Sequence, residues 1–173
     1  AGDGQRTVSD AATQLAWLFR ARRDRYRMLL LSRRHPIPDN HGIAGHAADM
    51  VWAVEQLGWG RAVWECNSAG GPIGQLVAHR RPDLVAGLVL SSSLHRTAAH
   101  TRSVLERWLE LLDRRRWRDY LWSTIEHTYH HGLWRYRLAK PLLGLTIRRD
   151  NIDTRTRPIL RELLDLDHRR ILP

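Results

Sequence analysis

Ser68 is the residue of this chain whose surroundings most favour chemistry. The apolar stretch 62–66 leads into this serine, and a helical pattern follows at once from Gly70. A strand-to-helix turn of this kind forces the serine into a strained backbone conformation and lifts its hydroxyl clear of the sheet edge. The small neighbours Ala69 and Gly70 allow the strand and helix backbones to approach closely. Ser68 is therefore a candidate nucleophile, suited to attack on a carbonyl carbon.

The flanking patterns predict the elements that position this serine. Apolar runs predict buried strands over 26–32, 62–66 and 85–91, and amphipathic or helical patterns predict helices over 43–57 and 70–80. Alternating strands and helices at this spacing predict an α/β fold with a parallel sheet and right-handed crossovers. In such sheets the reactive site lies beyond the carboxyl ends of the strands, and Ser68 directly follows one of those ends.

The stretch around Ser68 resembles the nucleophile elbow of the α/β-hydrolase fold family, in its serine hydrolase and esterase branch. The usual pattern is Gly-x-Ser-x-Gly, and here Cys66 stands in place of the first glycine. Three more stretches look like family segments: 81–91 like the one after the nucleophile helix, 32–35 like the turn after the fourth strand, and 2–5 like the loop after the third. The resemblance covers residues 1–95 and implies a partial α/β-hydrolase fold, a parallel sheet with flanking helices plus a helical cap.

The resemblance implies acyl transfer to water from an ester-like small-molecule substrate. Ser68 would attack the carbonyl, and the N–H groups of Ala69 and Asp3 would hold the oxyanion. Serine at the elbow argues against the dehalogenase and epoxide-hydrolase branches of the family, which use aspartate there.

The family's order of catalytic residues is serine, acid, histidine, with the acid after the seventh strand and the histidine after the eighth. The sequence matches a central segment without the N-terminal strands and without the C-terminal acid and histidine region. His95, just after the strand 85–91, is a local candidate for the base, although a plain loop histidine is the favoured interpretation. A non-catalytic, truncated hydrolase-like module, with a binding role or no activity, stays open as the alternative function.

The second half of the chain has a different sequence pattern, in which helical periodicity dominates. We expect residues 1–95 to form the partial core and residues 96–173 to form a helical cap, with helices over 103–112, 117–127 and 157–166. Trp108 and Trp122 are candidate pocket residues for an apolar substrate. Packing inside the cap is the favoured alternative for each tryptophan, because aromatic side chains dominate cores generally.

Two acidic residues carry structural expectations. Glu65 lies inside a strand expected to be buried on both faces, so we expect a structural ion pair with Arg33 or Arg34. A role for Glu65 as an unusual catalytic acid is the less favoured alternative. Asp49 is expected on the solvent side of its helix.

Histidine spacing near residue 130 invites a metal hypothesis. His127 and His131 lie four residues apart, but the pattern is not His-Glu-x-x-His and no third ligand is evident. The sequence therefore predicts no metal site, and it predicts no cofactor.

Composition bounds the remaining function classes. The 173 residues carry a net charge of +10, but the arginine clusters at 114–116 and 148–149 are interleaved with acids, which favours a solvated surface over nucleic-acid binding. No run of about 18 apolar residues appears, so no membrane span is expected. The single cysteine, Cys66, excludes an internal disulfide and favours a reducing cytoplasmic location. A homodimer stays open.

Overall fold

The computed structural model describes residues 13, 16–22, 24–34, 36–38, 40–128 and 156–172. Its elements, in chain order, are α2 (Gly42–Gln56), β1 (Ala62–Asn67), α3 (Gly70–Arg80), the 3-10 turn η1 (Pro82–Leu84), β2 (Val85–Ser91), α4 (Ala99–Asp113), α5 (Trp117–Thr128) and α8 (Arg157–Leu164). The helices and strands predicted between residues 43 and 91 are confirmed to within about one residue. The helix predicted from 103 begins at 99, and the one predicted to end at 166 ends at 164.

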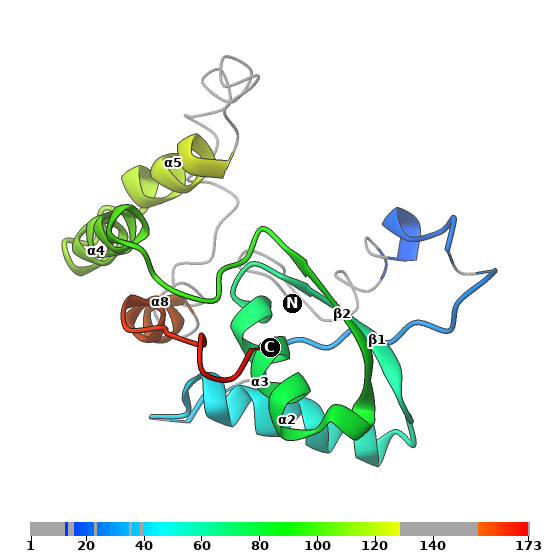
Figure 1. The fold of residues 1–173 in the computed structure, drawn as a ribbon. Helices are drawn as coiled ribbons and strands as arrows, with labels where there is room; N and C mark the ends of the chain where they lie inside the picture. Colours follow the sequence, from blue (N-terminus) through cyan, green and yellow to red (C-terminus); the bar gives the residue numbers. More distant parts are fainter. Residues whose placement is uncertain are drawn as a thin grey trace.

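β1 and β2 form a two-stranded parallel sheet in which Ala62 pairs with Val85 and Asn67 pairs with Ser91. The helix between them, α3, packs against both strands (Figure 1). Parallel strands joined by a helix end at the same edge of the sheet. The residues that follow β1 and β2 are therefore neighbours at that edge.

The two faces of this sheet have different surroundings. Along β1, alternate residues are half-buried on the side of α3 and exposed on the other side. Val63 is 66% exposed and Val89, on the neighbouring strand, is 49% exposed. Parallel sheets are usually covered on both faces. Within the described residues, only α3 covers this sheet, and it covers one face.

The strand predicted over 26–32 is wrong. These residues are extended but pair with no other strand of the described chain, and Met28 and Leu30 are 46% and 56% exposed. An apolar run becomes a strand only where a neighbour's N–H and C=O groups meet its own. The free edge of β1 does not meet this segment, so the run remains a loop, of which Leu31 alone packs against the core.

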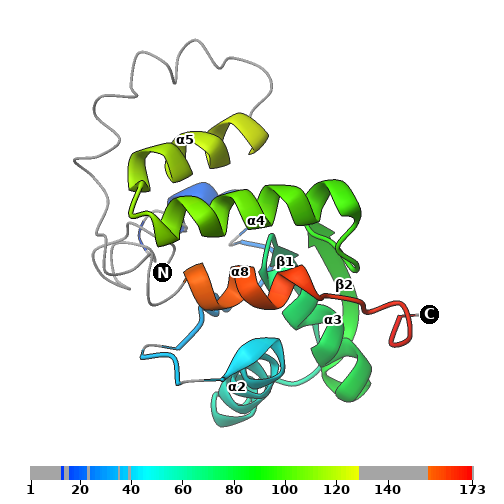
Figure 2. The same cartoon turned by 90° about the vertical axis from the view of Figure 1, so that its left-hand side faces the viewer.

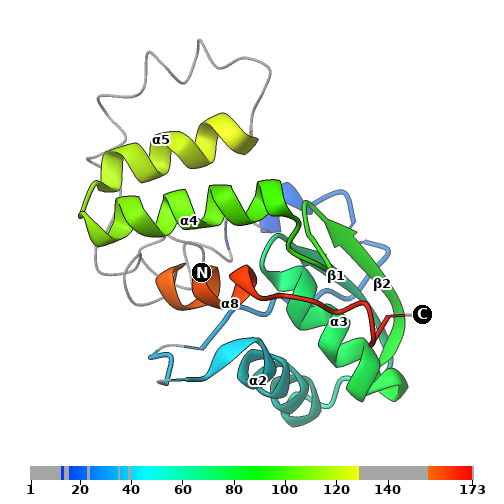
Figure 3. The same ribbon diagram turned by 60° about the vertical axis from the view of Figure 1, so that its left-hand side comes forward.

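The helices stack in the order α5, α4, α8, α2 (Figures 2 and 3). α8 contacts both α4 and α2, and α2 in turn contacts α3. One hydrophobic cluster runs through this stack and α3, with Leu112 on α4 and Val77 on α3 completely buried. The division between a core at 1–95 and a cap at 96–173 remains a prediction. No described helix has the length and apolarity that crossing a membrane requires.

The segment after α8 returns to the loop that follows β2. The Thr97 N–H donates to the Leu166 carbonyl at 3.0 Å, and the His168 N–H donates to the His95 carbonyl at 2.8 Å. An isolated antiparallel bridge joins Arg96 to Asp167 between these two bonds. These contacts hold the C-terminal segment beside the sheet edge at which β2 ends.

Candidate active site

Ser68 stands between the last residue of β1 and the first of α3, as the sequence predicts. Its φ is +52°, a left-handed conformation that costs free energy in a residue other than glycine. Two backbone bonds of 2.9 Å fix the turn: the Ser68 N–H donates to the Ser91 carbonyl, and the Gly71 N–H donates to the Ser68 carbonyl. Ser68 is exposed. The geometry is therefore that of a strained turn which presents a hydroxyl to solvent at the sheet edge.

Two glycines of α3 allow the helix to approach the strands this closely. A Cβ on Gly74 would lie 2.4 Å from Cys66 Sγ, and a Cβ on Gly71 would lie 1.7 Å from Ser93 Oγ. The side chain of Cys66 occupies space that a glycine at that position would leave open, and Gly74 provides the room instead. Burial raises the pKa of the Cys66 thiol, with a smaller contribution from the charge of Glu65. The thiol is therefore a packing group here.

The first turn of α3 has no side-chain cap within the described part of the chain, although its Gly71 N–H donates to the Ser68 carbonyl. Ala69 is its N-cap residue, and among the described residues no side chain accepts a hydrogen bond from the N–H groups of this turn. Helix N-termini attract negative charge because their N–H groups point outward without partners. Ala69 as an oxyanion donor remains a prediction, and Asp3, its expected partner, lies outside the described residues.

A base for Ser68 is not placed by the described contacts. The Ser68 hydroxyl makes no hydrogen bond to any histidine of the described chain, and His95 is exposed in the loop after β2. His168 is engaged elsewhere, since its Nδ1 lies 2.9 Å from Gln75 Oε1. Burial lowers the pKa of His168, against a smaller opposing effect of Asp167. His95 therefore stays a prediction.

The structure contradicts both expectations for Glu65. Glu65 lies on the uncovered face of β1, where its side chain is 49% exposed, and its partner is Arg22, with Nη1 to Oε2 at 2.7 Å. The prediction of burial assumed a sheet covered on both sides. Arg34 instead lies 3.5 Å from Asp49. An exposed pair such as Arg22–Glu65 contributes about 0–1 kcal/mol to stability.

The structure contradicts the expectation that Asp49 lies on the solvent side of α2. Its side chain is only 23% exposed, and its Oδ2 lies 2.7 Å from His41 Nε2. His46, one turn earlier in α2, is 3% exposed. Sequence reasoning missed this cluster, although the spacing of His46 and Asp49 places them on one helical face.

The two tryptophans proposed for a pocket are held in the helical half. Trp108 donates to Ser123 Oγ at 3.0 Å and meets the Tyr120 ring edge-on at 6.1 Å. Trp122 is 9% exposed and donates to Glu126 Oε1 at 2.5 Å. These contacts support the packing interpretation, while a pocket role for either tryptophan remains a prediction.

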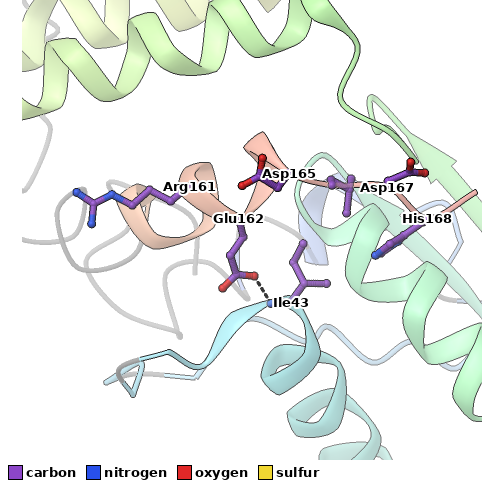
Figure 4. A pocket seen from close by; sticks show the side chains of 7 residues that line it. Ile43, Arg161, Glu162, Asp165, Asp167 and His168 are labelled. Carbon is purple, nitrogen blue, oxygen red and sulfur yellow. Dashed lines mark hydrogen bonds between the residues drawn. The ribbon is translucent and has the colours of Figure 1, made fainter.

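An open cavity of about 530 Å³ lies where α8 and the segment after it face the start of α2 (Figure 4). Glu162 reaches from α8 to accept a hydrogen bond from the Ile43 N–H, within the first turn of α2. A Cβ on Gly42 would lie 2.7 Å from Glu162 Oε1, so the glycine leaves room for this carboxylate. The remaining lining is charged or polar apart from Leu166: Arg161, Asp165, Asp167 and His168.

Comparison with known proteins bears on this geometry. The family model of the alpha/beta hydrolase fold matches residues 20–131, which is more than half of the chain. Among curated proteins no relative matches the sequence. The chain resembles the crystal structure of MGS-M2, an alpha/beta hydrolase enzyme from a Medee basin deep-sea metagenome library, with a TM-score of 0.68 at 20% identity. The likeness covers 79% of this chain and 52% of that one, so the chain spans about half the length of that enzyme.

Proposed function

Because the chain belongs to the α/β-hydrolase fold family, we propose that it is a serine hydrolase that cleaves an ester-like bond with Ser68 as the nucleophile. The observation that carries this proposal is the backbone of Ser68, whose φ of +52° lies at the turn between β1 and α3. A left-handed serine at this position costs stability and exposes the hydroxyl. Such a cost is typical of functional sites.

The proposed reaction begins when Ser68 Oγ attacks the carbonyl carbon of a small acyl substrate and its proton passes to a base. The carbonyl oxygen becomes an oxyanion, which the Ala69 N–H would stabilise at the start of α3. Collapse expels the alcohol and leaves an acyl group on Ser68. Water then attacks this ester, and the carboxylic acid departs as the serine recovers its proton. His95 is our candidate for the base, and Asp3 our candidate for a second oxyanion donor.

A fluorophosphonate probe tests the nucleophile directly, because it forms a covalent bond only with an activated serine. We expect labelling of the 173-residue chain and none of the Ser68→Ala variant. Ser92→Ala is a matched control, since Ser92 is also exposed and left-handed, with φ +50°, at the end of the neighbouring strand. Labelling that persists in Ser68→Ala would refute the assignment.

A non-catalytic binding module is the second candidate function. It is favoured by one observation: in the described part of the chain no histidine is hydrogen-bonded to the Ser68 hydroxyl. A serine without a base keeps an ordinary pKa and reacts slowly. Complete absence of labelling in a folded chain would favour this function over the hydrolase.

The same proposal includes a cytoplasmic location and a homodimer. The single thiol of the chain, Cys66, supports the location, because reducing compartments keep cysteines unpaired. The uncovered sheet face that bears Val63 and Val89 supports association of two copies. Light scattering at several protein concentrations would test the homodimer.

A further inference from the structure

Two histidines and a carboxylate meet where α2 begins. His41 precedes the helix, while His46 and Asp49 follow on its first two turns. Each of the three offers one ligand atom, and these three atoms lie within 4.8 Å of one another. The rings of His41 and His46 meet edge-on, with 4.9 Å between their centroids. The three side chains therefore converge on one point.

His46 has an unusual environment within this cluster. The residue is 3% exposed, and its Nδ1 is buried without a hydrogen-bond partner in the described part of the chain. Leaving a buried polar atom unpaired is costly, and a cation bound there would give this ring nitrogen the partner it lacks.

We propose that His41, His46 and Asp49 bind one divalent transition-metal cation, of which Zn²⁺ fits the donors best. Two imidazole nitrogens and one carboxylate oxygen are a donor set that Zn²⁺ accepts, with water in the fourth position. Mg²⁺ and Ca²⁺ prefer oxygen ligands and are excluded by the two imidazoles. The site is separate from Ser68 and does not depend on the proposed hydrolase reaction.

Binding requires two rearrangements. The most distant of the three ligand atoms, up to 4.8 Å apart, must move closer together to share one cation. His41 Nε2 and Asp49 Oδ2 lie 2.7 Å apart and share a hydrogen bond, so the metal would replace the shared proton and move these atoms slightly apart. The bound cation would tie the loop before α2 to the first two turns of the helix. A bridge across eight residues of sequence would stabilise this region of the fold.

The charge of Arg34 opposes the cation. Its Nη1 lies 3.5 Å from Asp49 Oδ1, the oxygen that does not contact His41, and its side chain is 54% exposed. Coulomb repulsion between a guanidinium and a nearby divalent ion weakens binding. Removal of Arg34 should therefore strengthen binding, which is opposite in sign to the removal of a ligand.

Calorimetric titration of the 173-residue chain with Zn²⁺ tests the site. We expect one equivalent to bind, and His41→Gln and Asp49→Asn each to weaken binding by at least tenfold, since loss of an outer-shell partner alone costs about 10–100-fold. His127→Gln is the matched control and should leave binding unchanged, since His127 is an exposed histidine on α5. Zn²⁺ should also raise the Tm of the wild type, and the rise should be lost in Asp49→Asn.

Arg34→Ala separates a ligand site from a merely structural ion pair. This variant loses the same ion pair with Asp49 as Asp49→Asn does, yet it keeps every proposed ligand and should bind Zn²⁺ more tightly. Both ligand variants alter partly exposed side chains, and circular dichroism verifies that they fold. The proposal is overturned if Zn²⁺ gives no heat, if Mg²⁺ binds equally well, or if either ligand variant binds like the wild type.

Discussion

Two neighbouring helices, α2 and α3, begin in opposite ways. At α2 the protein supplies its own acceptor, because the Glu162 carboxylate of α8 binds the Ile43 N–H. At α3 no side chain of the described residues does this: the Gly71 N–H donates to the Ser68 backbone carbonyl, and Ser68 stands exposed beside the turn. Both helices carry partial positive charge at their N-termini. The comparison teaches that the start without a side-chain acceptor is the one beside Ser68, our proposed nucleophile, where a substrate oxyanion would take the acceptor's place.

Gly71→Ala should have the largest effect on stability, because it places a side chain in the first turn of α3, where Ser93 already fills the space. The new Cβ would lie 1.7 Å from Ser93 Oγ and 2.5 Å from Ser93 Cβ. We expect the free energy of unfolding to fall by about 3 kcal/mol, measured by urea denaturation.

Gly70→Ala is the control for this experiment. It lies next to Gly71 in the same turn, but no atom lies within 4 Å of its added Cβ. Its stability should change by less than about 1 kcal/mol. Equal effects of the two alanines would show that the helix start tolerates side chains freely and that the close approach is unimportant.

Acid should destabilise the fold near the start of α2, because His46 lies there. Its pKa is about 4 in the folded chain and 6.5 in the unfolded chain, so the unfolded chain binds a proton first as pH falls. Stability should therefore fall between pH 6.5 and 4, and we expect His46 to account for about 2 kcal/mol of this loss.

Denaturation of wild type and His46→Gln at several pH values isolates this contribution. The variant should lose less stability across the same range, because glutamine does not titrate. His168, whose pKa is also lowered, is present in both proteins and cancels in the difference. Parallel pH profiles for the two proteins would contradict the prediction.

Gly74→Ala should destabilise α3 one turn after its start. Its Cβ would lie 2.4 Å from Cys66 Sγ and 3.1 Å from Leu88 Cδ1. We expect a loss of about 1.5 kcal/mol in unfolding free energy. The double variant Cys66→Ala/Gly74→Ala should regain part of this loss, and strictly additive effects would show that sulfur and helix do not compete for the space.

Glu162→Ala should give the smallest loss of stability, because it removes only one hydrogen bond at the start of α2. Loss of the acceptor for the Ile43 N–H should cost about 1 kcal/mol. Glu162→Gln should cost less, because an amide oxygen still accepts the bond. Glu106→Ala, at an exposed position of α4, is the control. If Glu162→Ala and Glu106→Ala melt alike, α2 does not depend on this cap.

Local sequence signals predicted the elements around Ser68, because hydrophobic periodicity depends only on residues that are close in sequence. The errors fell where the outcome depends on distant neighbours. Whether 26–32 becomes a strand, and whether Glu65 is buried, is decided by what covers the sheet. The contact from Glu162 to Ile43 spans 119 residues, and no local pattern encodes it. The role of Gly74 was readable in principle from its spacing to Gly71 on one helical face.

The bonds from Thr97 to Leu166 and from His95 to His168 give the chain another property. The chain leaves the sheet edge at Thr97 and rejoins it at Leu166, at nearly the same place. A segment whose two ends are neighbours can be exchanged for one of different length at little entropic cost to the remainder. We therefore expect that another helical segment could replace this one at the sheet edge without changing the turn at Ser68 or the close approach at Gly71 and Gly74.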